Sequence, residues 1–486
     1  MRKYNPFIMG ILLLMALAVL FLMFRENISN NPLFKDNKEE KSERGLIEKK
    51  SVAIPFHMPA LPEILFPEHT CAITDYGAIG DGKFLNTESF QSAISDCAKQ
   101  GGGTVIIPPG IWLTGPIRLE SNINLHLEEG ARLLFSDVFS DYLPPVLTRF
   151  EGMELYNYSP FISAKDCTNI ALTGKGELDG NGDAWLAWND IMQNSNSDVS
   201  LKKGATNKLY EMSVRNIPVE KRVFGTEKDA IQPSFIEFIN CENILVEEIK
   251  IFNSPGWTLH PVYSRNITIK NISIDTEKRN TDGIVIDSSR NVIINNSSLN
   301  TGDDAVVIKS GKDHDGWRIN KSSENIIIHD LIIEDANSGI AIGSEMSADI
   351  RNVLVYNIDI QVADFGIRFK SMRGRGGIVE NIWIDNVFMR RMNLGAIQVD
   401  LNYGTPISGY DENKLPIFRN IEIKNVECRR TKDSLLLSGL PESPLENITL
   451  ENISIFSSRG TTLENIKSRL FKNVTVTIKG KPLLIE

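Results

Sequence analysis

The stretch that decides the fold is Asp282-Gly283-Ile284-Val285-Ile286-Asp287-Ser288, which returns 22 residues later as Asp304-Ala305-Val306-Val307-Ile308-Lys309-Ser310. In both copies the residues alternate at period two and many are β-branched, which is typical of a strand and not of a helix. A repeat of this length is about one coil of a stacked solenoid, in which equivalent positions of adjacent coils lie about 4.8 Å apart.

Two families of strands repeat along the chain. The first continues as Gly339–Ser344 and Gly366–Ser371, and the second begins each time at an Asn. Asn suits such a turn because it tolerates the left-handed backbone conformation. Many short strands at this repeat predict an all-β fold, a single-stranded right-handed parallel β-helix in which every coil buries an inward row. The second family starts at Asn169, Asn243, Asn266, Asn291, Asn325, Asn352, Asn381, Asn420, Asn447 and Asn473.

The ends of the chain divide it into three parts. Residues 1–24 hold the apolar stretch Phe7–Phe24 behind Arg2 and Lys3, which indicates either an export signal or a single membrane anchor. Residues 25–70 are charged and then Pro-rich, as in a tether. Residues 71–486 form the expected β-helix, which can be this long because a solenoid grows along one axis. We expect an exported protein, in the periplasm, at the cell surface or outside the cell.

One helix is expected, from Thr87 to Gln100. Its apolar stripe ends before Gly101-Gly102-Gly103, a strong helix stop. We expect this helix to cap the N-terminal end of the stack, because an open end exposes unpaired strand edges. The stripe comprises Phe90, Ala93, Ile94, Cys97 and Ala98.

The cysteines do not form a disulfide framework, because there are five and they are widely spaced. Cys71 and Cys97 are candidates for one disulfide at the helix cap. Cys167 and Cys241 each precede a marker Asn by two residues and are expected to be buried thiols. No CxxC, HxxxH or acidic calcium loop occurs, so we expect neither a metal nor a cofactor.

The net charge of −10 argues against nucleic acid as a partner. It would also repel a polyanionic glycan, so such a substrate has to be met by local cations. Candidates are Lys309, Arg368, Lys370, Arg373 and Arg375. We expect the protein to be a monomer.

Three carboxylates gather at the repeat itself. Asp282 and Asp304 occupy the same position of adjacent coils, and Asp303 lies beside Asp304. Their mutual repulsion disfavours ionising all three. A glycosidase uses this situation, because one carboxyl has to stay protonated as the acid while another stays ionised as the base.

The motifs together resemble those of glycoside hydrolase family 28, the polygalacturonase family of pectin hydrolases. The resemblance extends from about Ala72 to the C-terminus. Its matching pieces are Asn280-Thr281-Asp282-Gly283, Thr301-Gly302-Asp303-Asp304, Gly339–Glu345 and Arg368-Phe369-Lys370, with Asn157–Pro160 and Trp257–Pro261 upstream.

This resemblance implies inverting hydrolysis of a pectic polysaccharide. Asp303 is then the general acid, while Asp282 and Asp304 position and deprotonate the attacking water. An inverting pair is expected to lie about 6.5–9.5 Å apart, which leaves room for that water. The same motifs assign substrate binding to Asn280, Lys309, Arg368 and Lys370.

Arg368 and Lys370 lie on one side of a strand, because they are two residues apart. An Arg at this position can clamp a uronate carboxylate with two hydrogen bonds. The alternative is an exposed charge on a solvated strand face. Lys309 either contacts the same sugar or forms an ion pair with Asp287.

Two features bear on the substrate. Asn337-Ser338 stands where the family usually has a His, which favours a decorated pectic glycan such as rhamnogalacturonan over plain galacturonan; neither His260 nor His314 is expected to replace that residue. The insertion from Asn181 to Pro233 is expected to close one end of the groove and favour exo action. Its aromatic residues either stack on sugars or cover the solenoid; they are Trp185, Trp188, Tyr210 and Phe224, near Arg222.

Two other functions are compatible with such a solenoid. A pectate-lyase-like enzyme would need a basic proton abstractor and usually calcium, and it would yield unsaturated products. A non-catalytic glycan-binding solenoid would be unaffected by Asp303→Asn. The acidic triplet favours hydrolysis over both.

Overall fold

The computed structural model describes residues 47–192, 199–226, 228–404 and 410–485. The apolar stretch Phe7–Phe24 and the first part of the expected tether lie outside them. Within these ranges, no helix is long and apolar enough to cross a membrane. The described residues belong to one compact unit that begins at Ile47.

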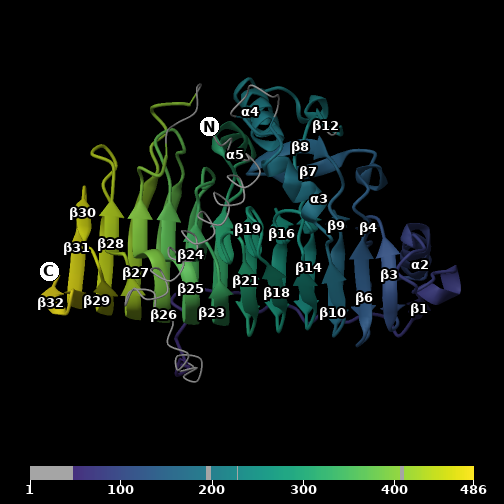
Figure 1. Ribbon diagram of the computed structural model, residues 1–486, viewed down its shortest axis with the longest axis horizontal. Helices are drawn as coiled ribbons and strands as arrows, with labels where there is room; N and C mark the ends of the chain where they lie inside the picture. The colour runs from purple at the N-terminus through teal and green to yellow at the C-terminus, as the bar shows by residue number, and fades with distance from the viewer. Residues whose placement is uncertain (1–46, 193–198, 227, 405–409, 486) are drawn as a thin grey trace, which may run out of the picture. The chain divides into compact units, whose positions relative to one another are not determined.

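The strands stack in parallel coils (Figure 1). Ile284 pairs with Val306 and Val306 with Ile340, so the segments aligned in the sequence are neighbours in space. The right-handed parallel β-helix with an N-terminal capping helix is therefore confirmed as the fold. The row that carries the acids, here called the acid row, consists of β4 (Ile117–Arg118), β9 (Ile162–Lys165), β13 (Ile236–Ile239), β16 (Leu259–Val262), β19 (Ile284–Asp287), β22 (Val306–Lys309), β24 (Ser338–Ile342), the ends of β25 (Ile350–Lys370) and β26 (Ile378–Asp400), β28 (Asp433–Ser438) and β30 (Thr462–Glu464).

The remaining rows close each coil. The asparagine row consists of β1 (Thr70–Ala72), β2 (Gly103–Ile107), β5 (Ile123–Leu127), β10 (Thr168–Gly174), β14 (Glu242–Glu247), β17 (Arg265–Lys270), β20 (Arg290–Asn295), the starts of β23 (Ser323–Asp335), β25 and β26, then β27 (Ile417–Thr431), β29 (Glu446–Ser457), β31 (Arg469–Ile478) and the antiparallel β32 (Lys481–Leu484). The third row consists of β3 (Gly110–Thr114), β6 (Ala131–Phe135), β11 (Glu177–Asp179), β15 (Lys250–Phe252), β18 (Ser273–Thr276), β21 (Ser298–Thr301) and the middle of β23.

The core lies inside the coils. Ile284, Ile286, Val306 and Ile308 are all fully buried, as the alternation predicts. Burying one such side chain contributes about 1.5–3 kcal/mol, so the stacked inward row stabilises every coil. The outward residues between them, Val285 and Val307, are buried as well, because they pack with Trp257.

The marker asparagines form a ladder of side-chain amides. Asn266 Nδ2 donates to Asn243 Oδ1 at 3.0 Å, and Asn291 Nδ2 donates to Asn266 Oδ1 at 3.0 Å. Each of these residues has a φ near +55°, the left-handed region that Asn tolerates. Asn473 is the exception, because its amide bonds Asn452 in a neighbouring ladder and not Asn447. The prediction that Asn473 begins a strand of the second family, in line with Asn447, was therefore wrong.

The expected helix is α2 (Thr87–Lys99), and it covers the first coil beside η2 (Ile73–Tyr76). Phe90, Ala93, Ile94 and Cys97 are fully buried, whereas Ala98 is only half-buried. All the cysteines are buried free thiols, so the disulfide considered between Cys71 and Cys97 is not formed.

The end of the expected tether packs against the solenoid. Lys50 N donates to Asn357 Oδ1 at 3.0 Å, and Asn386 Nδ2 donates to Glu48 O at 2.8 Å. The ring of Phe56 stacks on Trp383 at 5.9 Å. Docked structure thus begins before residue 71, where we had expected the folded part to start.

An additional lobe covers part of the acid row (Figure 1). It is built from segments inserted between the coils, and its own small core contains Phe150, Met153, Leu209 and Phe224. Its elements are η3 (Phe139–Tyr142), β7 (Val146–Phe150), β8 (Met153–Asn157), α3 (Asp183–Leu186), η4 (Ala187–Asn189), α4 (Leu201–Val214), η5 (Val219–Lys221), β12 (Val223–Phe224) and α5 (Asp313–Ile319).

Candidate active site

Asp282 and Asp304 each lie two residues before a strand of the acid row. The backbone ladder passes through them, because Gly283 N donates to Asp304 O at 2.9 Å and Ala305 N donates to Ser338 O at 2.8 Å. The two acids therefore share one column of the repeat, as the alignment predicted. Gly302 permits the turn before them, since a Cβ there would stand 1.8 Å from Lys278 O.

The third acid completes a compact group. Asp282, Asp303 and Asp304 each bring a carboxylate oxygen within 4.8 Å of the others. Asp304 N donates to Asp303 Oδ1 at 3.0 Å. The nearest oxygens are therefore closer than the spacing of about 6.5–9.5 Å expected between an inverting acid and base. Spacing alone does not favour inversion here, and the stereochemistry has to be measured.

Two lysines neutralise part of this charge. Lys370 Nζ donates to Asp304 Oδ2 at 2.6 Å, and both side chains are buried. Lys309 lies beside the acids but pairs with Glu345 at 2.7 Å. The ion pair considered between Lys309 and Asp287 is therefore wrong. Asp287 pairs instead with Arg149, at 2.9 Å.

The surroundings shift the pKa values of the acids in opposite directions. Burial disfavours the ionised form of Asp304, but Lys370 and Lys309 outweigh it and lower the pKa of this carboxyl. Burial, followed by the charge of Asp304, raises the pKa of Asp303. Burial and Asp303 raise the pKa of Asp282 well above its usual value. The surroundings thus favour the ionised form of Asp304 and the protonated forms of Asp303 and Asp282.

Arg368 lies on the open side of the acids, and its side chain is half-buried. Its guanidinium donates to Asn337 Oδ1 at 3.0 Å and lies over the Phe365 ring at 3.7 Å. Asn337, one of the two residues where a His was expected, therefore orients this arginine. No carboxylate of the described residues pairs with Arg368 within 4.0 Å, so it remains available to an anion.

Asn280 has a different environment from the other predicted site residues. Its φ is +65°, which fits a turn residue before Thr281 and Asp282. Among the described residues, no hydrogen bond joins its side chain to the acidic triplet. A substrate-binding role for Asn280 stays a prediction.

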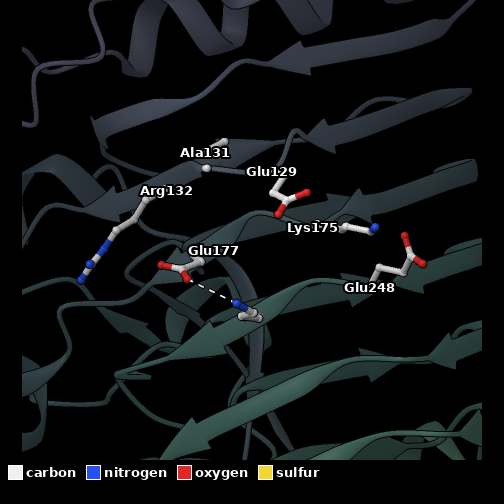
Figure 2. A pocket seen from close by; sticks show the side chains of 8 residues that line it. Glu129, Ala131, Arg132, Lys175, Glu177 and Glu248 are labelled. Carbon is white, nitrogen blue, oxygen red and sulfur yellow. Dashed lines mark ion pairs between the residues drawn. The ribbon is translucent and has the colours of Figure 1, made fainter.

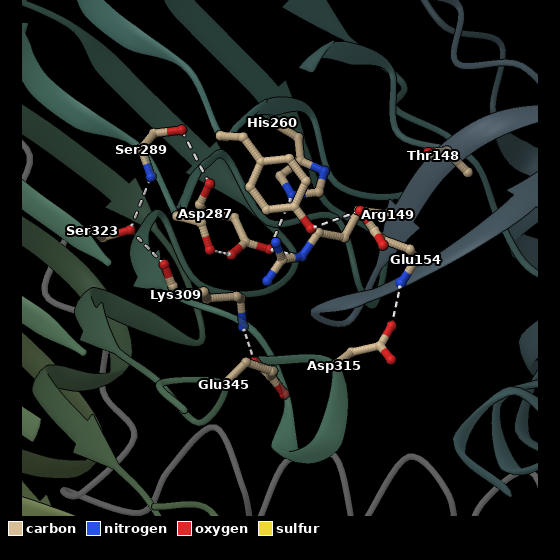
Figure 3. Close-up of polar contacts among 12 residues, drawn as sticks. Thr148, Arg149, Glu154, His260, Asp287, Ser289, Lys309, Asp315, Ser323 and Glu345 are labelled. Carbon is tan, nitrogen blue, oxygen red and sulfur yellow. Dashed lines mark hydrogen bonds and ion pairs between the residues drawn. The ribbon is translucent and has the colours of Figure 1, made fainter. Parts of the chain in front are cut away.

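The acid row is covered on the N-terminal side of the acids. In Figure 3, Arg149 of β7 reaches Asp287 of β19. His260 lies 3.1 Å from Glu237 and 3.6 Å from Asp287. Thr148 donates to Glu237 at 2.5 Å. All four charged side chains are almost fully buried, so β7 and β8 seal the outward face of β13, β16 and β19.

The roof formed by β7 and β8 is held by a second buried pair. Arg222 Nη1 donates to Asp315 Oδ2 at 2.7 Å, and the same carboxylate accepts from Glu154 N at 2.9 Å. Lys312 pairs with Glu151 at the hairpin turn at 3.0 Å. Within the lobe, these charged groups join β8, α5 and the residue before β12 to one another.

The aromatic residues of the insertion cover the solenoid and do not face the groove. Trp185 is fully buried, with its ring 5.1 Å from that of Tyr142 and 4.7 Å from that of Phe139. Trp188, Tyr210 and Phe224 are buried as well. The interpretation of these residues as sugar-stacking platforms is therefore wrong. Trp185 and Trp188 pack against the solenoid core, whereas Tyr210 and Phe224 belong to the small core of the lobe.

Several residues of the site were not assigned from sequence. Glu345 belongs to the quoted motif Gly339–Glu345, but nothing in that pattern predicted its pair with Lys309. Trp257 lies 4.9 Å below the Lys309 ammonium and stacks on Phe150 at 6.3 Å. Arg149 and Lys202 come from the lobe, where no repeat or motif marks them.

Two groups of side chains have metal-ligating types. The acidic triplet is one, but Lys370 and Lys309 already supply positive charge there. The other comprises His69, Cys71 and Cys97 near α2, within 4.8 Å of one another. It offers three ligands, whereas a structural zinc site uses four. We assign no metal to either group.

A depression on the third row lies away from the acids (Figure 2). It is lined by both signs of charge, and Lys250 pairs with Glu177 at 3.6 Å. Arg132 in the same wall pairs with Asp179. Because these charges neutralise one another, the depression has no charge preference for a ligand.

Comparison with known proteins gives consistent relatives. The model of the family described as "Glycosyl hydrolases family 28" matches residues 223–477. A probable polygalacturonase of Vitis vinifera is 31% identical over 80% of this chain and 74% of its own length. An exo-poly-alpha-D-galacturonosidase of Dickeya chrysanthemi is 26% identical over 83% of this chain and 70% of its own. The crystal structure of a hyperthermoactive exopolygalacturonase from Thermotoga maritima superposes with a TM-score of 0.77 and 36% identity, covering 88% of this chain and 96% of that one.

Proposed function

The chain belongs to glycosyl hydrolase family 28, and on this premise we propose that it removes galacturonate units from the end of a galacturonan chain by inverting hydrolysis. It is a glycosidase that hydrolyses pectic galacturonan. The observation that supports exo action is the roof of β7 and β8, held by Arg149 and Asp287 next to the acids. Family membership also disfavours the lyase and the non-catalytic alternatives.

The chemistry follows from the charges of the triplet. Asp303, whose pKa is raised, donates its proton to the glycosidic oxygen as the bond to the anomeric carbon breaks. The leaving oxygen keeps the bonding electron pair and becomes a hydroxyl. Asp304, held ionised by Lys370, takes a proton from the water that attacks the opposite face. Asp282 hydrogen-bonds and orients that water.

The roof gives the groove one closed side. Toward the N-terminus, Glu237, His260 and Asp287 are covered by the hairpin, so a long polymer cannot continue over them. Toward the C-terminus, the outward residues Arg368, Asp400 and Leu436 remain partly accessible. A chain end therefore enters from the open side and stops at the roof.

Digestion of de-esterified galacturonan tests this function. We expect mainly small product from the first minutes, with a slow fall in viscosity, because each cut shortens the polymer only at its end. A rapid viscosity fall with mixed oligomers would contradict exo action. Parallel digestion of rhamnogalacturonan tests the substrate indicated by Asn337-Ser338: release of product from it alone would overturn galacturonan as the substrate.

The same digest reports the stereochemistry. Proton NMR during the first turnovers is expected to show the product with the anomeric configuration opposite to that of the cleaved bond, before mutarotation mixes the two forms. Retention of configuration would show that one of the closely spaced acids is a nucleophile and would sink the inverting mechanism.

Lys370→Met should move the pH profile of hydrolysis. Activity is lost at high pH when Asp303 gives up its proton, and at low pH when Asp304 gains one. Lys370 lowers the pKa of both carboxyls, so its removal raises both, and both limbs of the profile shift to higher pH. Rates measured across pH check this. Lys424→Met, which changes the partly exposed pairs with Glu422 and Glu451, should leave the profile in place. Unchanged limbs in Lys370→Met would contradict the assignment.

We further propose that the protein acts outside the cytoplasm on a pectic polysaccharide. The support is the apolar stretch Phe7–Phe24, which lies outside the described residues. Cleavage and anchoring remain two alternatives. The mass of the mature protein distinguishes them, and a full-length cytoplasmic product would contradict both.

A further inference from the structure

Lys202 occupies an unusual place for a lysine. It is the second residue of α4 (Leu201–Val214) in the lobe, and its side chain is only 8% exposed, whereas the neighbouring Lys203 is exposed. A cation in the first turn of a helix opposes the helix dipole, and burying an ammonium without a paired anion costs free energy. Neither helix stability nor packing explains why the charge is there.

A series of ring contacts leads from Lys202 toward the acids. Its ammonium lies 5.6 Å from the centre of the Phe150 ring, and Phe150 stacks on Trp257 at 6.3 Å. Trp257 in turn lies beside Lys309 on the floor of the groove. Lys202 thus lies on the lobe side, at one end of a series of contacts that leads to a lysine beside the acids.

The charges that act on Lys202 also indicate that it lies near the acids. Burial lowers the pKa of this lysine, and the carboxylates of Glu151, Asp282 and Asp303 raise it only in part. Two of those three carboxylates belong to the acidic triplet. A lowered pKa is what an ammonium shows when it is desolvated without an anion in direct contact.

Three other lysines around the acids already have carboxylate partners. Lys370 pairs with Asp304 at 2.6 Å, Lys309 with Glu345 at 2.7 Å, and Lys312 with Glu151 at 3.0 Å. In the described part of the chain, no carboxylate oxygen lies within 4.0 Å of Lys202 Nζ, and no hydrogen bond to it is found. Among the described residues, Lys202 is thus a buried lysine without a paired carboxylate.

We propose that Lys202 binds the carboxylate of the sugar held at the closed end of the groove, and so selects a uronate over a neutral sugar or an ester there. This inference rests on the proposed galacturonan hydrolysis. Arg368, whose guanidinium bonds only a neutral amide, lies on the opposite side of the acids and suits the carboxylate of the next sugar. The two cations then flank the scissile bond.

The test compares digalacturonate with its two mono-methyl esters, each esterified on a different sugar. Lys202→Met keeps the length of the side chain and removes its charge. We expect kcat/KM for free digalacturonate to fall by about 10- to 100-fold, the usual loss for a charge-assisted hydrogen bond, whereas kcat/KM for one of the two esters should change little. Arg368→Met should also lower kcat/KM for free digalacturonate, and the ester on which it has little effect should be the other one.

Two controls separate recognition from structure. Lys203→Met changes the exposed neighbour on the same helix and should leave all three substrates unaffected. Lys202→Arg keeps the charge and should retain the preference for the free acid. Equal losses on the acid and both esters in Lys202→Met would show a structural role and overturn the inference.

The inference can be overturned even if Lys202→Met does not fold. A wild-type protein that hydrolyses both esters as fast as the free acid already overturns recognition of a carboxylate at either position. Wild-type protein that hydrolyses neither digalacturonate nor the polymer refutes the proposed function itself. An active wild type with an unchanged Lys202→Met refutes only the role of Lys202.

Discussion

Replacing Asp303 with Asn is expected to lower kcat by about 10²- to 10⁴-fold, because the amide cannot supply the proton that the leaving oxygen needs. Substrate binding should persist, since Lys370 and Arg368 are unchanged. The measurement is reducing-sugar release from galacturonan at saturating substrate. KM should change much less than kcat.

The fold should tolerate this change. Asn removes the repulsion of Asp303 on Asp304 and Asp282, so the midpoint of thermal unfolding is expected to stay level or rise. Asp359→Asn is the matched control, because Asp359 is another carboxyl whose pKa is raised by burial, in the third row. It should retain wild-type kcat. An Asp303→Asn enzyme with more than about a tenth of the activity would remove Asp303 from the acid role.

Replacing Arg149 with Met is expected to destabilise the protein by about 3–5 kcal/mol. The change leaves Asp287 buried beside His260 without its nearest cation, and both members of the original pair are almost fully buried. Urea unfolding followed by circular dichroism gives the free energy of unfolding. Because the pair fastens β7 to β19, we also expect larger oligomers among the products as the roof loosens.

An exposed pair provides the comparison for this prediction. Arg265 and Glu242 belong to adjacent coils, with side chains 46% and 31% exposed. Arg265→Met should cost less than about 1 kcal/mol, because solvent screens such a pair. Equal destabilisation by the two variants would contradict the view that burial makes the Arg149 contact important.

Much of the solenoid was predictable, because its order is local and periodic. Each coil repeats the same inward apolar residues, and Asn266 and Asn291 hold equivalent turns through equivalent amides. Asn473 shows where this reasoning fails. Its short alternating run resembles the others, but the preceding coil differs in length and moves Asn473 onto the ladder of Asn452. Register depends on the whole coil and not on the segment after the Asn.

The acids of the site were predictable for the same reason. Asp282 and Asp304 share a column because their segments align, and Lys370 follows two coils later in the repeat. Their ion-pair partners were not predictable. The repeat suggested Asp287 as a partner of Lys309. Only the packing of the Glu345 loop and of Arg149 shows that Lys309 pairs with Glu345 and Asp287 with Arg149.

By itself, the sequence determined the β-helix, the cap at α2 and the column of acids, because each follows from residues one repeat apart. Only the tertiary structure decided which side of the groove is closed and which lysine lacks an anion. Those features depend on β7, β8 and α4. These elements lie outside the repeat, so no periodic pattern in the sequence predicts what they pack against. The physical reason is burial. The lobe removes Arg149, Asp287 and Lys202 from water, and a buried charge costs free energy unless it is paired.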